Sequence, residues 1–252
     1  MKQRIVAIIP ARMAATRFPD KPLKPILGMP LVEHVRRRVM LCEMLDEVIV
    51  ATCDEEIKDV VEAAGGRVVM TSDSHVRCTE RIAEAAEDLT ADIIVNVQGD
   101  EPLVMPQMMD EVIQPLLDDP GLPSVNLVTR ITDPEEFENP NAPKLVTNRS
   151  GDVLYISREP IPSRRKSASD DYLKLKQLGI IAFRSDFLQH FVRLEPTPYE
   201  IVESVDMMRA VEHGYRIKTV ITEHRMLGVD VPEDVSKVEE VLKTDPLLKC
   251  YM

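Results

Sequence analysis

The first half of the chain alternates short apolar runs with amphipathic stretches. The apolar runs, rich in β-branched residues and typical of buried strands, occupy residues 4–10, 47–52, 67–70 and 93–97. The intervening stretches carry apolar residues at helical spacing, and they occupy residues 31–44, 55–64 and 79–89. This alternation predicts a parallel sheet whose strands are joined by right-handed helical crossovers.

The pattern changes after residue 124. Residues 124–130 and 177–183 read as strands, and residues 144–158 read as a β-hairpin that turns at 148–152. Further helices are predicted at 106–118, 185–191, 197–214 and 232–242, and further strands at 216–222 and 227–230. We expect one α/β domain over residues 1–252, with a mixed, mostly parallel sheet flanked by helices. Region 124–183 would contain the hairpin as an elaboration.

Composition narrows the class of protein. Of the 252 residues, 44% are hydrophobic and 29% are charged, which is typical of a soluble globular protein, and no apolar run approaches the ~20 residues of a membrane span. The net charge of −12 argues against non-specific binding of nucleic acid. The four cysteines form no C-x-x-C pair and no secretory signal pattern opens the sequence, so we expect free thiols and a cytoplasmic protein.

The first candidate chemistry follows the strand at 93–97. That strand ends on Gln98, Gly99, Asp100 and Glu101, and Pro102 prevents its continuation. Ligands of open α/β sheets bind beyond the carboxyl ends of the strands, and one or two carboxylates with phosphate oxygens suit Mg²⁺. The alternative is that the acids only begin a polar loop.

A second candidate is the loop after the first strand, which carries Arg12, Arg17 and Lys21. It contains no glycine, so it is neither a Walker A loop nor a dinucleotide-binding loop. Arginine forks and a lysine point charge fit polyphosphate, although a solvated basic loop would look the same. Together with Asp100 and Asp230, which end separate predicted strands, these cations suit a Mg²⁺-nucleotide and direct displacement at phosphorus.

An ordered set of motifs adds a resemblance. The segments P-A-R-x-x-x-T-R-x-P-x-K-P-L at 10–23, V-Q-G-D-E-P at 97–102 and G-V-D-x-P-E-D at 228–234 are similar to those of the 3-deoxy-manno-octulosonate cytidylyltransferase (CMP-Kdo synthetase) family. Shorter matches at 27–34, 62–66, 79–81, 139–144, 157–162 and 178–180 follow in the same order. The resemblance therefore covers nearly the whole chain.

The resemblance implies a Rossmann-like nucleotidyltransferase fold and a homodimer in lipopolysaccharide biosynthesis. It implies a reaction that joins CTP to the anomeric hydroxyl of an acidic 2-keto sugar, Kdo or a close analogue, and releases pyrophosphate. It places Arg12, Arg17 and Lys21 on the triphosphate, Asp100 and Asp230 on Mg²⁺, and Gln98 and Arg81 near the nucleotide. The residues it implies for the sugar are Arg158, Arg164, Arg165, Gln177, Glu200 and Glu203. For Glu200 and Glu203 an exposed acidic helix face is the alternative.

The chain departs from the family pattern at four points. It has Asp20 for a common Gly, Cys53 for Asp, Arg77-Cys78 for Ser-Gly, and Gln177 for His. Gln177 is either a neutral substitution or a sign of a different acceptor, such as another sugar acid or a phosphonate. A nucleotide-binding protein without turnover is a third hypothesis, but a mere binder has no need of two metal-binding acids.

Overall fold

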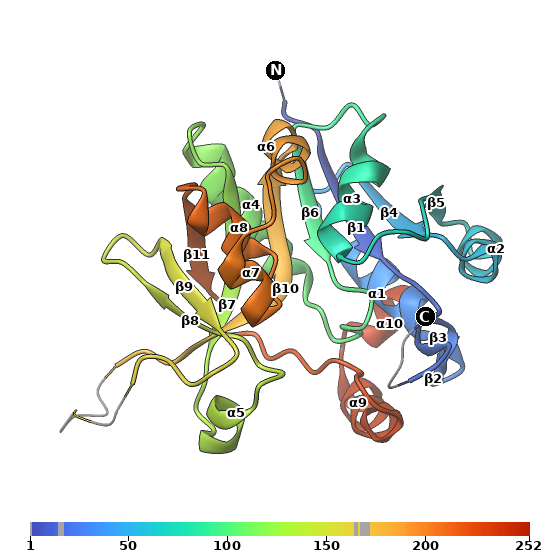
Figure 1. The fold of residues 1–252 in the computed structure, drawn as a ribbon. Coiled ribbons are helices and arrows are strands. Elements are labelled where there is room, and N and C mark those ends of the chain that lie inside the picture. The colour runs from blue at the N-terminus through green and yellow to red at the C-terminus, as the bar shows by residue number, and fades with distance from the viewer. Residues whose placement is uncertain (1, 15–17, 164–165, 167–171) are drawn as a thin grey trace. The chain divides into compact units, whose positions relative to one another are not determined.

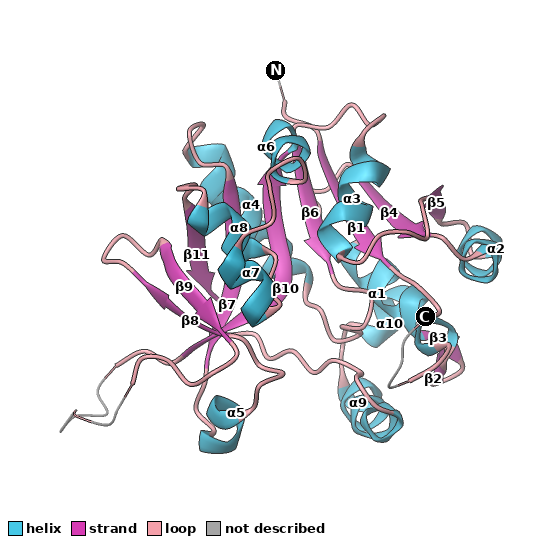
Figure 2. Cartoon of the chain, viewed as in Figure 1, coloured by secondary structure: helices cyan, strands magenta, loops and turns pink. Residues whose placement is uncertain are grey.

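The computed structural model describes residues 2–14, 18–163, 166 and 172–252. By its internal contacts the chain divides into two compact units. Unit 1 comprises Met1–Asp110 and Arg225–Met252, and unit 2 comprises Glu111–His224. Helices and strands are labelled in Figure 1, and Figure 2 shows them by type.

Unit 1 is built on a parallel sheet. Its strand order places β6 (Ile93–Val97) beside β1 (Ile5–Pro10), followed by β4 (Glu47–Thr52) and β5 (Arg67–Met70). Every residue of β1 and β6 is buried, which explains why both appear in the sequence as almost uninterrupted apolar runs. Because the strands are parallel, their carboxyl ends lie at one edge of the sheet. The candidate residues that follow β1 and β6 therefore lie at that edge.

Helices and short elements complete unit 1. They are η1 (Lys21–Leu23), β2 (Pro25–Ile26), β3 (Met29–Pro30), α1 (Leu31–Val39), α2 (Glu55–Ala63), α3 (Cys78–Ala86), the first turn of α4 (Pro106–Asp118), α9 (Pro232–Thr244) and α10 (Leu248–Tyr251). The helix predicted to end at residue 44 ends earlier, because Leu41 and Cys42 donate to carbonyls three residues back and tighten the last turn. The tight β2–β3 turn has left-handed φ values of 48° at Leu27 and 85° at Gly28.

A small core cluster anchors the first loop of unit 1. Phe18, Ile26 and Leu31 pack with Leu103 and with apolar residues of the closing segment, Val229, Val238 and Leu242. The cluster therefore fixes the basic loop, the β2–β3 hairpin and the C-terminal helix against each other.

Unit 2 has mixed strand pairing. In it β7 (Ser124–Arg130) pairs parallel with β11 (Ile217–Ile221) and antiparallel with β10 (Leu175–Arg184). The predicted hairpin is present as β8 (Lys144–Thr147) and β9 (Val153–Ser157), and β8 also pairs with β10. The helices of unit 2 are the rest of α4, α5 (Pro134–Glu138), α6 (Ser185–Phe191), α7 (Pro198–Glu203) and α8 (Met207–Glu212). Over both units the strand pairings are mixed and mostly parallel and helices flank the strands, which confirms the predicted fold class.

Two predictions of secondary structure were wrong. Residues 227–230 form no strand, because their backbone bonds to the loop after β6 rather than to a strand: Val229 N–H donates to Asp100 O at 2.9 Å. The single helix predicted for 197–214 is divided, because Ser204 adopts a left-handed conformation (φ 51°, ψ 46°) and ends α7. Among the described helices, none has the length and apolar character that crossing a bilayer requires.

Candidate active site

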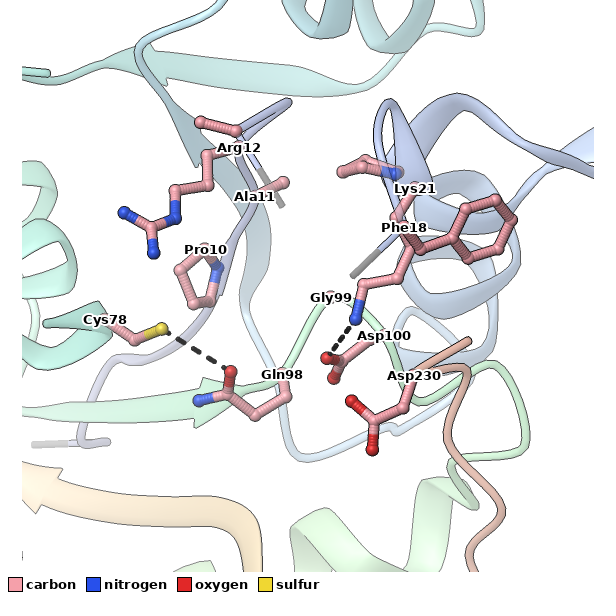
Figure 3. A pocket seen from close by; sticks show the side chains of 12 residues that line it. Pro10, Ala11, Arg12, Phe18, Lys21, Cys78, Gln98, Gly99, Asp100 and Asp230 are labelled. Carbon is pink, nitrogen blue, oxygen red and sulfur yellow. Dashed lines mark hydrogen bonds and ion pairs between the residues drawn. The ribbon is translucent and has the colours of Figure 1, made fainter. Parts of the chain in front are cut away.

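A pocket of about 300 Å³ opens in unit 1 beyond the carboxyl ends of β1 and β6 (Figure 3). Five of the residues singled out from the sequence line it: Arg12, Lys21, Gln98, Asp100 and Asp230. They come from three segments of the chain, and the fold brings them together. The remaining lining residues are Pro10, Ala11, Ala14, Phe18, Pro22, Cys78 and Gly99.

Lys21 is the ionic centre of the pocket. Its Nζ donates to Asp100 Oδ2 at 2.7 Å and to the Val229 carbonyl at 2.9 Å. The lysine side chain is 15% exposed and the aspartate side chain 34%, so the pair is only partly screened by water. The short helix η1 supplies this lysine, and its N-cap Asp20 has a left-handed backbone (φ 57°). Lys21 thereby connects the first loop to both segments that carry the acids.

Position 99 requires glycine because the segment after β6 passes very close to the end of β1. A Cβ atom there would lie 2.8 Å from the Pro10 carbonyl oxygen, which is backbone and cannot move out of the way like a side chain. Glycine therefore lets the end of β6 approach the end of β1. This approach sets the spacing between the basic loop and Asp100.

Asp230 reaches the pocket through a loop and not through a strand. Its backbone N–H donates to Asp234 Oδ2 at 3.1 Å, and Val231 N–H donates to the same oxygen at 3.2 Å, at the start of α9. Gly228 packs against Glu101: a Cβ at Gly228 would lie 3.1 Å from Glu101 Oε1. These contacts hold Asp230 on the side of the pocket where Asp100 and Lys21 lie (Figure 3).

Arg12 and Arg81 line a second, smaller cavity of about 40 Å³, which shares Pro10, Ala11, Arg12 and Cys78 with the first. Arg12 is exposed, whereas Arg81 is 3% exposed and donates from its guanidinium to Thr71 Oγ1. Arg81 thus lies beside the main pocket but not in its lining. Arg17 lies outside the described residues.

Cys78 is a pocket residue that the sequence reasoning did not include among the site residues. It is the first residue of α3, it is exposed, and its thiol lies 3.6 Å from Gln98 Oε1 as a hydrogen-bond donor. Its departure from the family pattern was the signal that marked it, but no spacing rule places a helix N-terminus in this pocket. Phe18 and Pro22 also line the pocket and were not among the predicted site residues.

The residues expected to hold the sugar belong to unit 2. Arg158 donates from its guanidinium to three backbone carbonyls, Glu203 O at 2.8 Å, Pro140 O at 2.9 Å and Ser204 O at 3.1 Å. The Glu203 carboxylate accepts from Tyr155 Oη at 3.0 Å, Ser157 Oγ at 2.9 Å and Arg158 N at 2.8 Å. Burial, with the neighbouring Glu203 carboxylate, raises the pKa of Tyr155 to about 12. Arg158 and Glu203 are therefore brought together.

Glu200 lies in a different environment. Its side chain is 3% exposed, and its two carboxylate oxygens accept from Arg209, from Nε at 2.7 Å and from a terminal nitrogen at 2.6 Å. This buried, bidentate pair joins α7 to α8. Glu200 therefore lies neither on an exposed acidic face nor in an open sugar-binding position. The proposed sugar site does not include it.

Gln177 faces Asn126. Its amide nitrogen donates to Asn126 Oδ1 at 2.6 Å, and Asn126 in turn donates to the carbonyls of Leu127 and Leu178 at 3.0 and 3.1 Å. The pairing of β7 with β10 shifts register between Gln177 and Ile181, so Gln177 lies at the edge of an irregularity. Arg164 and Arg165 lie outside the described residues.

Comparisons with known proteins agree with this geometry. A cytidylyltransferase family model matches residues 6–219. Two similar proteins, both named 3-deoxy-manno-octulosonate cytidylyltransferase, come from Geobacter metallireducens (46% identical) and Geobacter sulfurreducens (45% identical). Each match covers 95% of this chain, and 98% and 99% of the respective relatives.

Solved structures of cytidylyltransferases are also similar to this chain. CMP:2-keto-3-deoxy-manno-octonic acid synthetase complexed with CTP superposes with a TM-score of 0.89 at 36% identity, covering 95% of this chain and 98% of that chain. The 4-diphosphocytidyl-2C-methyl-D-erythritol synthase of Anaerococcus prevotii, at 18% identity and a TM-score of 0.64, shares the fold; that match covers 96% of this chain and 100% of that one. With a family model over most of its length and relatives at 45–46% identity, the chain belongs to the 3-deoxy-manno-octulosonate cytidylyltransferase family.

Proposed function

We propose that this protein joins CTP to the anomeric hydroxyl of 3-deoxy-manno-octulosonate, giving the CMP-sugar and pyrophosphate. The observation that carries the proposal is the pocket in which Lys21, Asp100 and Asp230 converge beyond the ends of β1 and β6. Family membership supports the choice of CTP and of this sugar. Activated sugars of this kind are consumed in lipopolysaccharide synthesis, where we place the product.

In the proposed reaction the sugar's anomeric oxygen attacks the α-phosphorus of CTP. The bond from that phosphorus to the bridging oxygen of pyrophosphate breaks, and the hydroxyl proton leaves to solvent. Lys21, Arg12 and Arg17 would hold the triphosphate and stabilise the negative charge that develops on pyrophosphate. Gln98 and Arg81 would lie at or near the nucleoside. No covalent enzyme intermediate is required.

Asp100 and Asp230 would hold Mg²⁺. The donor set fits this ion, because two carboxylates line one pocket beside the proposed phosphate site, and Mg²⁺ is usually held by one or two carboxylates together with substrate phosphates. Within the described residues no group of three or more His, Cys, Asp or Glu forms an all-protein metal cage, which agrees with a metal shared with substrate. Bound there, Mg²⁺ would neutralise phosphate charge.

We propose that residues 1–252 act as one cytidylyltransferase domain, with region 124–183 serving the sugar and the dimer. Arg158, with Arg164 and Arg165, would bind the sugar carboxylate, since guanidinium groups bind carboxylates bidentately. Glu203 would orient Arg158 and the hydroxyls of Tyr155 and Ser157 toward the sugar. Gln177 would line the same acceptor region.

Two further features of the family are proposed here. A homodimer is supported by α7, which exposes Tyr199, Ile201 and Val202 to 53%, 64% and 79%. A cytoplasmic location is supported by the four free cysteines, Cys42, Cys53, Cys78 and Cys250, since thiols persist in reducing compartments.

Pyrophosphate release from CTP, Mg²⁺ and the sugar tests the proposal. Lys21→Ala should lower kcat/KM by roughly 10² or more, because it removes a charge aimed at the phosphates. Lys2→Ala is the matched control, since Lys2 is 76% exposed and pairs only with Asp46 at the surface among the described contacts. Equal, small effects of both changes would contradict the role of the loop.

The two acids are tested in the same assay. Asp230→Asn should lower kcat/KM by at least ~10² and leave thermal stability nearly unchanged. Asp100→Asn should do the same to turnover, with some loss of stability because Lys21 loses its partner. Near-normal turnover in either variant would remove that residue from the metal site.

The second candidate function keeps the chemistry and changes the acceptor. Gln177, which cannot become cationic as a histidine can, favours it. Screening the wild-type enzyme with CTP against several 2-keto sugar acids and a phosphonate would separate the two. Absence of pyrophosphate release with every acceptor would instead favour a nucleotide-binding protein without turnover.

A further inference from the structure

Arg12 and Lys21 enter the pocket from the two ends of the basic loop, residues 11–23. Figure 3 shows the two side chains on opposite sides of the pocket. The end of the loop is anchored, because Phe18 is buried in the core cluster and Lys21 donates to Asp100. The start of the loop needs an anchor of its own, since the Arg12 side chain is exposed and cannot hold its backbone by burial.

Two hydrogen bonds anchor the start of the loop, one on each side of Arg12. Ala11 N–H donates to the Ala51 carbonyl at 2.9 Å, which extends the pairing of β1 with β4 by one residue. Met13 N–H donates to Asp54 Oδ2 at 2.8 Å. The first bond joins main-chain groups, which every residue type except proline can provide, whereas the second depends on a particular side chain. Asp54 therefore completes the fixation of the backbone around Arg12.

Asp54 is the N-cap residue of α2, but its carboxylate does not cap that helix. An aspartate at this position ordinarily accepts from an N–H of the first helical turn, as Asp133 does from Glu135 N–H at 2.9 Å at the start of α5. Among the described residues, no N–H of α2 donates to the Asp54 side chain. The carboxylate is directed at the loop instead, and its Oδ2 also accepts from the Cys53 thiol at 3.7 Å. The contact with the loop is therefore not a by-product of helix capping.

The place of Asp54 is itself fixed by β4 and α2. Asp54 N–H donates to Thr52 Oγ1 at 3.1 Å, and Thr52 is fully buried at the end of β4. The Asp54 carbonyl accepts from Lys58 N–H at 3.2 Å, which begins the helical hydrogen bonding of α2. A carboxylate on so fixed a backbone can hold Met13 in one place, and the Arg12 side chain then leaves the loop in one direction.

We propose that Asp54 is a positioning residue for nucleotide binding, which holds the start of the basic loop so that Arg12 is presented to the triphosphate. The inference rests on the proposed function, in which Arg12 binds the phosphates. Without the Asp54 acceptor, the backbone around Arg12 would have to be ordered when CTP binds, and that ordering opposes binding. The loss should appear in the affinity for CTP and not in the KM for the sugar.

Calorimetric titration of CTP with Mg²⁺ into Asp54 variants, without sugar, measures this loss. Asp54→Ala should weaken CTP binding roughly 5- to 20-fold, the scale of one hydrogen bond to a charged group, while the KM for the sugar stays within about twofold. Asp54→Asn keeps an oxygen that can accept from Met13 N–H, so its CTP affinity should stay within about threefold of the wild type. Asp46→Ala is the matched control, because Asp46 precedes β4 and accepts from Ile5 N–H at 2.9 Å at the opposite end of β1. It should leave the CTP affinity unchanged.

A double-mutant cycle separates positioning from a general loss of structure. In an Arg12→Ala background, Asp54→Ala should weaken CTP binding by less than about twofold further, because the side chain that it positions is already gone. Additive effects of the two changes would overturn the proposal. So would an unchanged CTP affinity in Asp54→Ala, or an equal loss in Asp46→Ala.

If Asp54→Ala fails to fold, Asp54→Ser replaces it. Serine is also a preferred N-cap residue, but its hydroxyl is one bond shorter than the carboxylate, so it should lose the Met13 contact and weaken CTP binding to the same extent. CTP binding without pyrophosphate release in the wild type would refute the proposed function, while the affinities would still decide the role of Asp54.

Discussion

Replacing Glu200 by glutamine should destabilise the protein without touching its substrate site. The Glu200 carboxylate receives two hydrogen bonds of 2.6–2.7 Å from Arg209, and the two side chains are 3% and 5% exposed. Arg209 also lies over the Phe191 ring, 5.2 Å from its centroid. A neutral glutamine would remove the Glu200 charge from this buried, bidentate pair.

Breaking a buried ion pair from one side costs about 3–5 kcal/mol. In a protein of this size 1 kcal/mol corresponds to about 2–4 °C, so Glu200→Gln should lower the melting temperature by roughly 6–20 °C. The KM for the sugar, measured well below that temperature, should stay within about twofold, because the carboxylate does not face an open site.

Differential scanning calorimetry with steady-state kinetics checks this prediction. Glu195→Gln is the matched control, because Glu195 is an exposed acid just before α7 and should change neither quantity. The double variant Glu200→Leu with Arg209→Leu should be less destabilised than the two single changes together, since it leaves no unpaired charge. An unchanged melting temperature with a raised KM for the sugar would refute the reasoning and restore Glu200 as a binding residue.

The remaining predictions concern four other positions. Asp20→Gly should stabilise the protein by about 0.5–1 kcal/mol in chemical denaturation, because glycine adopts the left-handed conformation (φ 57°) without the cost that a Cβ brings; a lower denaturation midpoint would contradict this. Gly99→Ala should lower kcat/KM at least ~10-fold, since the new Cβ would lie 2.8 Å from a backbone oxygen, and normal CTP turnover would show that this approach is not needed. Burial lowers the pKa of His34 below its ordinary value of 6.5, so the folded state binds its proton less readily than the unfolded state. Stability from His34 is therefore full above about pH 6.5 and declines as the pH falls below it, and His34→Gln should flatten the decrease in melting temperature between pH 7.5 and 5.5; a parallel decrease in both proteins would exclude His34. Gln177→His should change the order of preference among sugar acids if the acceptor site differs from the family's, and an unchanged order would make the substitution neutral.

The sequence was most informative where short-range signals decide the structure. The strand 93–97, the helix 106–118 and the turn at 148–152 were placed correctly, because β-branched runs, helical periodicity and turn residues act locally. The convergence of Lys21 and Asp100 was also predictable, since parallel strands end at one edge.

Long-range contacts set the limit of prediction. Residues 227–230 are rich enough in apolar residues to suggest a strand, yet their backbone bonds to Asp100 and Lys21, which no local pattern specifies. Glu200 shows the same limit: its spacing from Glu203 suggested a shared face, but Arg209, nine residues later, fixes the carboxylate after a left-handed break at Ser204. Such partners become visible only when the fold is known.

The hydrogen bond from Lys21 to the Val229 carbonyl also affects co-translational folding. The two residues are 208 positions apart. A ribosome adding about 5–20 residues per second needs roughly 10–40 s to proceed from one to the other. Throughout that interval the basic loop has been synthesised, while the segment that secures it has not. The nucleotide pocket can therefore be completed only after residue 229 has been synthesised, and a nascent chain stalled before that residue should bind CTP poorly even if its sheet has already formed.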